Sequence, residues 1–119
     1  MAVPQYSARK GYPDPIGGRS RLWLGDVGGP ASYTQWTAPN TGGDVVNARY
    51  MGLSSINFIA ATGLSESGTY YVEAKLSVAG GASPMTAILV WFLASSPGTQ
   101  ASAATNLSGE SIALMAIGG

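Results

Sequence analysis

The sequence TYYVEAKLSV, residues 69–78, alternates strictly between apolar and polar side chains. Apolar or aromatic residues occupy every second position from Tyr70, and Glu73 and Lys75 lie between them. This period of two is typical of an antiparallel strand with one buried and one solvated face. Residues 86–93 follow as a nearly continuous apolar run, which predicts a neighbouring strand that is buried on both faces.

Shorter segments with the same period lie on both sides of this pair, separated by turns rich in Gly, Ser and Pro. A loop rich in Ser, Ala, Gly and Thr covers residues 95–109, and no ten-residue segment has the period of an amphipathic helix. The pattern predicts an all-β domain over residues 21–119, an antiparallel β-sandwich or a jelly roll. Further strands are expected at residues 21–25, 33–37, 45–51, 55–61 and 111–117, and core side chains at Ile56, Phe58, Val72, Leu76, Val90 and Phe92.

Residues 1–20 are predicted to form an extended N-terminal arm attached to this domain. Three prolines remove backbone donors and force extended backbone on the residues that precede them. Because the segment has no local apolar surface to offset the entropy lost on ordering, we expect it to order against another chain. The expected contacts to that partner are the aromatic and basic residues Tyr6, Arg9, Lys10, Tyr12, Arg19 and Arg21.

Charge is scarce and unevenly distributed along the chain. Only 10% of the 119 residues are charged, and the formal net charge is zero. Residues 1–21 carry a balance of +3, and residues 22–119 carry a balance of −3. An acidic body without a basic stripe argues against nucleic-acid binding. A surface with so few charges is typical of a protein that associates with other subunits.

Hydrophobicity bears on stability and location. Leu, Ile, Val and Phe make up about a fifth of the chain, so we expect neighbouring subunits to contribute to its stability. The longest apolar run, residues 85–94, is too short for a bilayer, which takes about 20 residues. Residues 1–20 contain no apolar stretch of the secretory type. We therefore expect synthesis in a cytoplasm and no membrane contact.

The chain contains neither histidine nor cysteine. This excludes the common nucleophile–base pairs and the usual zinc and copper ligands. A Ser–Lys dyad would need Lys10 or Lys75, and Lys75 alternates with Glu73 on the polar face of a strand, as solvated charges do. Asp26 and Asp44 lie beside glycines, a pairing more typical of turns than of calcium sites. We expect no enzyme activity, no metal and no cofactor.

The tryptophans suggest an alternative binding chemistry. Trp23 and Trp36 lie on short predicted strands near the start of the domain, where exposed rings would stack on a sugar. Trp91 lies inside the apolar run and is expected in the core. Core or interface packing is the commoner role of such rings. A carbohydrate-binding β-sandwich, such as a receptor-binding or lectin-like module, is therefore the alternative hypothesis.

A proline-bearing leader, ARKGYPDP at residues 8–15, precedes a β body rich in Gly, Ala, Ser and Thr and a strand-like tail that begins ATNLSGES at residues 104–111. In this layout the chain resembles the small virion proteins of tailed bacteriophages, especially the capsid decoration (cement) proteins. The resemblance implies a virion protein, made in the host cytoplasm, that binds at junctions between subunits of the major capsid protein, often as a symmetric homo-oligomer. It assigns no individual functional residue. A tail or head–tail connector component is a further alternative.

Overall fold

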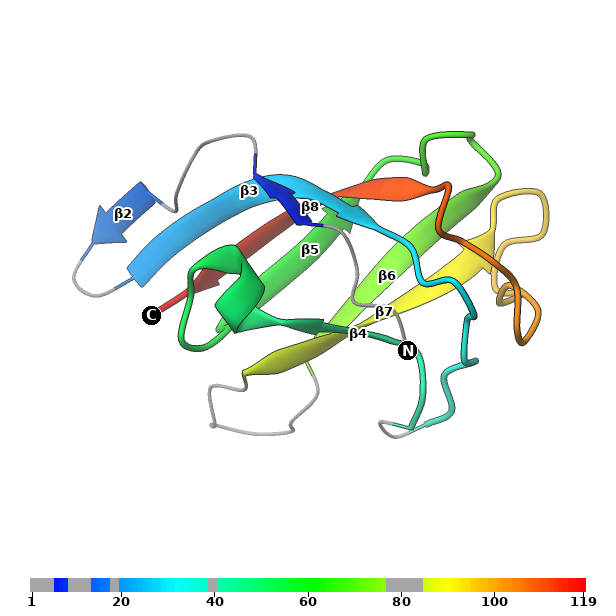
Figure 1. Cartoon of the computed structure of the whole chain (residues 1–119), viewed down its shortest axis with the longest axis horizontal. Coiled ribbons are helices and arrows are strands. Elements are labelled where there is room, and N and C mark those ends of the chain that lie inside the picture. The colour runs from blue at the N-terminus through cyan, green and yellow to red at the C-terminus, as the bar shows by residue number, and fades with distance from the viewer. Residues whose placement is uncertain (1–5, 9–13, 18–19, 39–40, 77–84) are drawn as a thin grey trace.

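The computed structural model describes residues 6–8, 14–17, 20–38, 41–76 and 85–119, which form two antiparallel sheets packed against each other (Figure 1). The larger sheet has the order β1-β3-β8-β5, with β2 also paired to β3, and the smaller has the order β4-β7-β6. The predicted all-β sandwich is confirmed. The strands are β1 (Tyr6–Ala8), β2 (Asp14–Gly17), β3 (Ser20–Gly28), β4 (Asp44–Asn47), β5 (Phe58–Thr62), β6 (Tyr70–Leu76), β7 (Thr86–Leu93) and β8 (Ser111–Gly118).

Inward side chains of both sheets form one hydrophobic core. In β8 the alternation is strict, because Ile112, Leu114 and Ala116 are buried and the residues between them are partly exposed. Trp91 of β7 is fully buried in the same core. Burial of this apolar surface is the main favourable term that offsets the entropy lost on folding.

Three of the predicted core residues, Ile56, Val72 and Val90, are buried. Leu76 and Phe92 are only partly buried. The prediction for Phe58 is wrong, because its side chain is 46% exposed. Phe58 is the first residue of β5, and it points away from the core while its neighbour Ile59 points inward. The Phe58 ring therefore lies on the outward side of the larger sheet.

The central strand β7 is buried on both faces, as its apolar run predicts. Leu89 belongs to the core, whereas Ile88 and Val90 are equally buried on the outer side of the smaller sheet. The chain around Trp36 and Gly43 covers that side. Gly43 has φ +80° and packs so closely that a Cβ would come within 2.3 Å of Ile88 Cγ2.

Residues 33–37, predicted as a strand, form a loop instead. Their backbone groups bond to the loop at residues 100–105: the Tyr33 amide donates to the Thr105 carbonyl at 2.9 Å, and the Trp36 amide donates to Gln100 Oε1 at 2.8 Å. No strand in the described part of the chain pairs with this segment, which forms only an isolated bridge between Thr37 and Thr41.

The strand predicted over residues 45–51 ends early. β4 stops at Asn47, and Ala48–Met51 form a 3₁₀ helix, η1. The Asn47 side chain accepts a hydrogen bond from the Arg49 amide at 3.0 Å and so caps the helix. Gly52, at φ +73°, ends it in the left-handed conformation that glycine favours. Local capping thus overrides the extended pattern.

Other boundaries follow from strand partners. β3 is longer than the predicted 21–25 because it pairs with β8 along its length, and β5 begins three residues later than predicted, where its pairing with β8 begins. β7 has the predicted bounds, and β6 and β8 lie within two residues of theirs where the structure describes them. The described helical segment, η1, is too short to cross a membrane.

The expectation that the arm orders only against another chain is wrong for two of its segments. β1 pairs with β3 through Tyr6–Val27 and Ala8–Gly25, and β2 pairs with β3 through Asp14–Leu22 and Pro15–Arg21. These ladder hydrogen bonds, and burial of the Tyr6 ring, offset the ordering entropy within the chain itself. The reason lies in β3, whose edge would otherwise present unpaired backbone groups.

We expect Ile56→Ala to lower the free energy of unfolding by about 2–5 kcal/mol, because a fully buried side chain is removed from a packed core. Leu64→Ala is the matched control: Leu64 is 58% exposed, so its loss should cost less than about 1 kcal/mol. Urea unfolding monitored by tryptophan fluorescence measures both. Equal losses for the two variants would contradict the described core.

Candidate functional site: an aromatic and basic cluster on the N-terminal strand

Four side chains form a stack that runs from the core to the surface beside β1. We call Tyr6, Trp23, Arg49 and Tyr50 the Tyr6 cluster. The Tyr6 ring meets Trp23 edge-on, with centroids 6.3 Å apart, and stacks on Tyr50 at 5.3 Å. The Arg49 guanidinium carbon lies 5.8 Å from the centroid of the Tyr50 ring. Each contact has the geometry of a favourable aromatic or cation–π pair.

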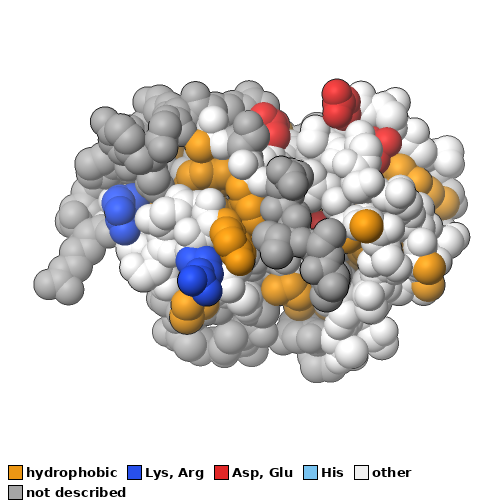
Figure 2. Space-filling view, viewed as in Figure 1, with side chains coloured by type: hydrophobic (Ala, Val, Ile, Leu, Met, Phe, Trp, Pro, Cys, Tyr) orange, Lys and Arg blue, Asp and Glu red, His pale blue; other side chains and the backbone are white. Residues whose placement is uncertain are grey.

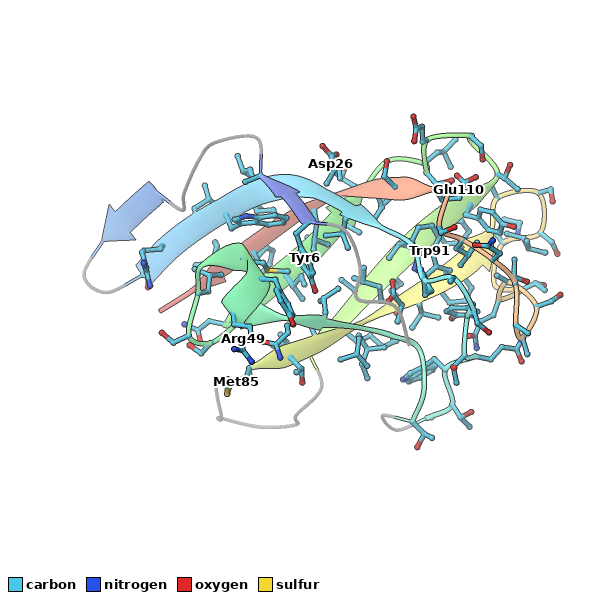
Figure 3. All side chains as sticks on the ribbon, in the orientation of Figure 1. Tyr6, Asp26, Arg49, Met85, Trp91 and Glu110 are labelled. Carbon is cyan, nitrogen blue, oxygen red and sulfur yellow. The ribbon has the colours of Figure 1, made fainter. Side chains whose placement is uncertain are left out.

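Three elements position this cluster. β1 brings Tyr6 to β3, where its register partner is Val27, and β3 itself supplies Trp23. η1 supplies Arg49 and Tyr50, and it lies against β1. In Figure 3 the labelled Tyr6 side chain extends from β1 toward the part of the chain that carries Arg49. The Tyr6 ring therefore bridges the larger sheet, which contains β1, and the smaller sheet, which contains β4.

A hydrogen bond fixes the Tyr6 ring in this bridge. The Asn47 amide donates to Tyr6 Oη at 3.0 Å. Burial raises the pKa of Tyr6 to about 12, and the nearby carboxylate of Asp44 acts in the same direction, so the phenol stays protonated at physiological pH. Asn47 thus has two roles: its backbone N–H donates to Tyr6 of the arm, and its side chain caps η1.

Exposure separates the cluster into a base and a tip. Trp23 is buried and Tyr6 is half-buried, whereas Arg49 is exposed and Tyr50 is 49% exposed. Tyrosine and arginine are enriched at the centres of protein interfaces, where a ring with few rotatable bonds provides contact area at low entropic cost. A tip of this composition on an ordered base can bind another protein surface.

Basic and acidic side chains lie apart on the face shown in Figure 2, with the Lys and Arg side chains on the left and the Asp and Glu side chains at the upper right. Arg49 lies on the basic side, and Asp26 and Glu110 lie toward the opposite end of β3 (Figure 3). Asp26, Glu66 and Glu110 line one open hollow there. A partner that binds the Tyr6 cluster therefore contacts the basic side of the molecule.

Asp44, predicted in a turn, is the first residue of β4 and is buried, with 3% of its surface exposed. Trp91 Nε1 donates to Asp44 Oδ2 at 3.1 Å. Burial raises the pKa of Asp44 to about 7, and the hydrogen bond from Trp91 counteracts only part of that rise. The buried Asp44 carboxyl, which lies near Tyr6, thus has a pKa close to neutrality.

The predicted partner contacts are distributed as follows. Tyr6 is engaged within its own chain, where it forms the middle of the cluster. Arg21 lies on β3, opposite Pro15 and Gly118, and is partly exposed. Arg9, Lys10, Tyr12 and Arg19 lie outside the described residues. Sequence reasoning missed Arg49 and Tyr50, and the signal that could have found them is the Asn47 cap, which turns the chain outward after a short strand.

The two rings proposed for sugar stacking have other environments. Trp23 is 3% exposed and packs below Tyr6, so its face is not available to a sugar. Trp36 is partly buried, and Lys75 Nζ lies 4.7 Å from its ring centroid. Lys75 also forms an exposed ion pair with Glu73 at 2.6 Å, in agreement with a solvated charge on the strand's polar face.

A metal site would need a group of suitable ligands among the residues that the structure describes. Within them, no group of three or more Asp or Glu side chains has an arrangement that could hold a metal ion. Comparisons of the chain with protein-family models, curated proteins and solved structures found no match. The candidate binding surfaces are therefore identified from the chemistry of the Tyr6 cluster and of the two sheets.

Titration of Asp44 should make stability fall as pH rises. The unfolded chain loses this proton near pH 4 and the folded chain near pH 7, so the contribution of Asp44 to stability is fully present below pH 4 and declines through that window. The slope approaches about 1.4 kcal/mol per pH unit. Asp44→Asn keeps an acceptor for Trp91 and should remove this slope. Urea unfolding of both proteins between pH 4 and 8 measures the difference, and parallel curves would contradict the burial of a titrating carboxyl.

Proposed function

We propose that this chain is a non-enzymatic structural subunit of a virus particle, a capsid decoration protein that binds the shell of major capsid subunits. The observation that carries the proposal is the Tyr6 cluster, which presents an exposed tyrosine and arginine on an ordered aromatic base. The class of particle comes from the sequence layout that resembles phage decoration proteins. Its location is then the virion, after synthesis in the host cytoplasm.

The ordering of the cluster supports a binding role. Tyr50 is held by stacking on Tyr6, and Tyr6 is held by the Asn47 amide, so the exposed ring loses little further freedom when a partner covers it. Preorganisation of this kind reduces the entropic cost of association. Arg49, on the basic side (Figure 3), can pair with carboxylates or carbonyls of the partner.

The scarcity of charge supports the same role. A decoration protein needs contact surfaces that are not strongly hydrated, and this chain has only 10% charged residues. Most of the exposed polar side chains that the structure describes are Ser, Thr and Asn, which can form hydrogen bonds across an interface without a large desolvation cost.

Point variants test the proposal better than removal of the arm, because deletion of Tyr6 would also uncover Trp23. We expect Arg49→Ala and Tyr50→Ala each to weaken binding to virus particles produced without this protein by at least about tenfold, the effect of contacts worth about 1.4 kcal/mol or more. Co-sedimentation with such particles measures the binding. Lys75→Ala, which removes a partly buried cation on the smaller sheet, is the matched control and should bind normally.

Circular dichroism would establish that the variants keep the fold. Undiminished particle binding by the double Arg49→Ala and Tyr50→Ala variant would remove the cluster from the contact. Failure of the wild-type chain to sediment with any particle, combined with retention on a glycan matrix, would replace the proposal with the carbohydrate-binding alternative.

A further inference from the structure

The outward side of the larger sheet is apolar. Its side chains alternate with those of the core and form rows across three strands, defined by the register of β3, β8 and β5. We call this surface the outer face. The first row is Leu22, Ile117 and Phe58, the second is Leu24, Met115 and Ala60, and the third is Asp26, Ala113 and Thr62.

Several of these side chains are far from buried. Leu24 is 38% exposed and Phe58 is 46% exposed, and the other apolar members of the rows are partly exposed. A solvated antiparallel sheet ordinarily presents polar residues on its outward face. Two consecutive rows without a polar side chain therefore indicate a surface that another protein covers.

A shallow hollow of about 360 Å³ lies on this face. Its lining includes the small side chains of Ala60 and Ala113, with Leu24 and Met115 beside them. The second row thus runs from the large Leu24 and Met115 to the small Ala60. A surface that carries both a protruding Leu24 and a hollow beside Ala60 can be complementary to itself.

We propose that the outer face binds the outer face of a second copy of this chain, about a two-fold axis parallel to β8. Such an axis places β3 of one copy over β5 of the other. Leu24 then meets Ala60 of the second copy, Leu22 meets Phe58, and each contact occurs twice, as an isologous interface requires. Met115 and Ile117 lie at the axis and meet their own counterparts.

Charge agrees with this axis. Asp26 is the acidic residue of the rows, and it lies on β3, away from the axis. The two Asp26 carboxylates therefore lie on opposite sides of the axis, each over the Thr62 row of β5. A two-fold axis across the strands at Asp26 would bring the carboxylates together, and like charges in direct opposition are destabilising.

The size of the face also fits a second copy. Its three strands, spaced about 4.8 Å apart, and a β3 of nine residues that rise about 3.3 Å each, give a face of about 14 by 30 Å. With side-chain relief, two such faces bury near the roughly 1,000 Å² in total that a specific interface needs.

This dimer is independent of the particle contact. Tyr6 packs on the core side of the larger sheet, so Arg49 and Tyr50 can stay exposed while the outer face is covered. Each copy of the dimer therefore keeps its own exposed Tyr6 cluster.

Multi-angle light scattering during gel filtration tests the proposal. We expect a mass of twice 12.1 kDa for the wild-type chain at about 100 μM, a concentration above the micromolar dissociation constant expected of a small interface. Leu24→Arg should elute as a folded monomer, because it places a charge at the centre of the face. Met85→Arg, at a residue that is 56% exposed before β7 of the other sheet, should remain a dimer.

A cross-linking experiment keeps the test decisive if Leu24→Arg fails to fold. The chain has no cysteine, so Met115→Cys introduces one thiol per copy near the axis. A short bis-maleimide should join two copies, since packed sheets lie about 10 Å apart. Met85→Cys should stay uncoupled under the same conditions.

A wild-type monomer at 100 μM, or equal cross-linking of the two cysteine variants, would overturn the proposal. A monomer that still sediments with particles would overturn the dimer and leave the proposed function in place. If the wild-type chain is a dimer but does not sediment with particles, the dimer is supported and the proposed function is ruled out.

Discussion

The antiparallel pairing of β3 with β8 is the interaction on which the rest of the structure depends. Eight consecutive register pairs, from Arg21–Gly118 to Gly28–Ser111, join the beginning of the domain to its end. Closure of so long a loop costs entropy that only the completed core repays. Once formed, the pair offers one further edge on each strand, and β5 takes the edge of β8 while the arm strands take the edge of β3.

The arm strands pair with β3 because its edge would otherwise be exposed. A long strand with unpaired amides and carbonyls would be a template for aggregation. β1 and β2 cover β3 in succession, and Tyr6 adds a ring that reaches Trp23 in one sheet and the Asn47 amide at the end of β4 in the other. The same contact that protects the edge also brings Tyr50 and Arg49 into a defined place at the surface.

The period of two in the strands separates the side chains of the two proposed contact surfaces. Along β3, the inward residues Trp23 and Val27 build the core below the Tyr6 cluster, while the outward Leu22 and Leu24 belong to the outer face. The two surfaces therefore do not compete. A chain with few charges and a small core can in this way obtain stability from a second copy and still present a basic, aromatic tip to a larger assembly.

Part of this architecture could be predicted from local sequence. β6 and β7 were predictable because strict alternation and an unbroken apolar run are local patterns, and each corresponds directly to the burial of a strand on one or both faces. The absence of histidine and cysteine likewise limited the chemistry without any knowledge of the fold. The Tyr6 half of the candidate site was visible as an aromatic residue that needed a partner.

The remainder depends on which distant segments meet. Residues 33–37 alternate like a strand, but they lie beside a loop and so form none. Phe58 looks like a core residue until the register of β5 on β8 turns it outward. Tyr50 joins the site because a ring from the arm lies against it, and Asp44 is buried because it faces inward opposite Leu89 and beside Trp91. Such contacts arise only when the chain closes over long sequence separations, and no local pattern encodes them.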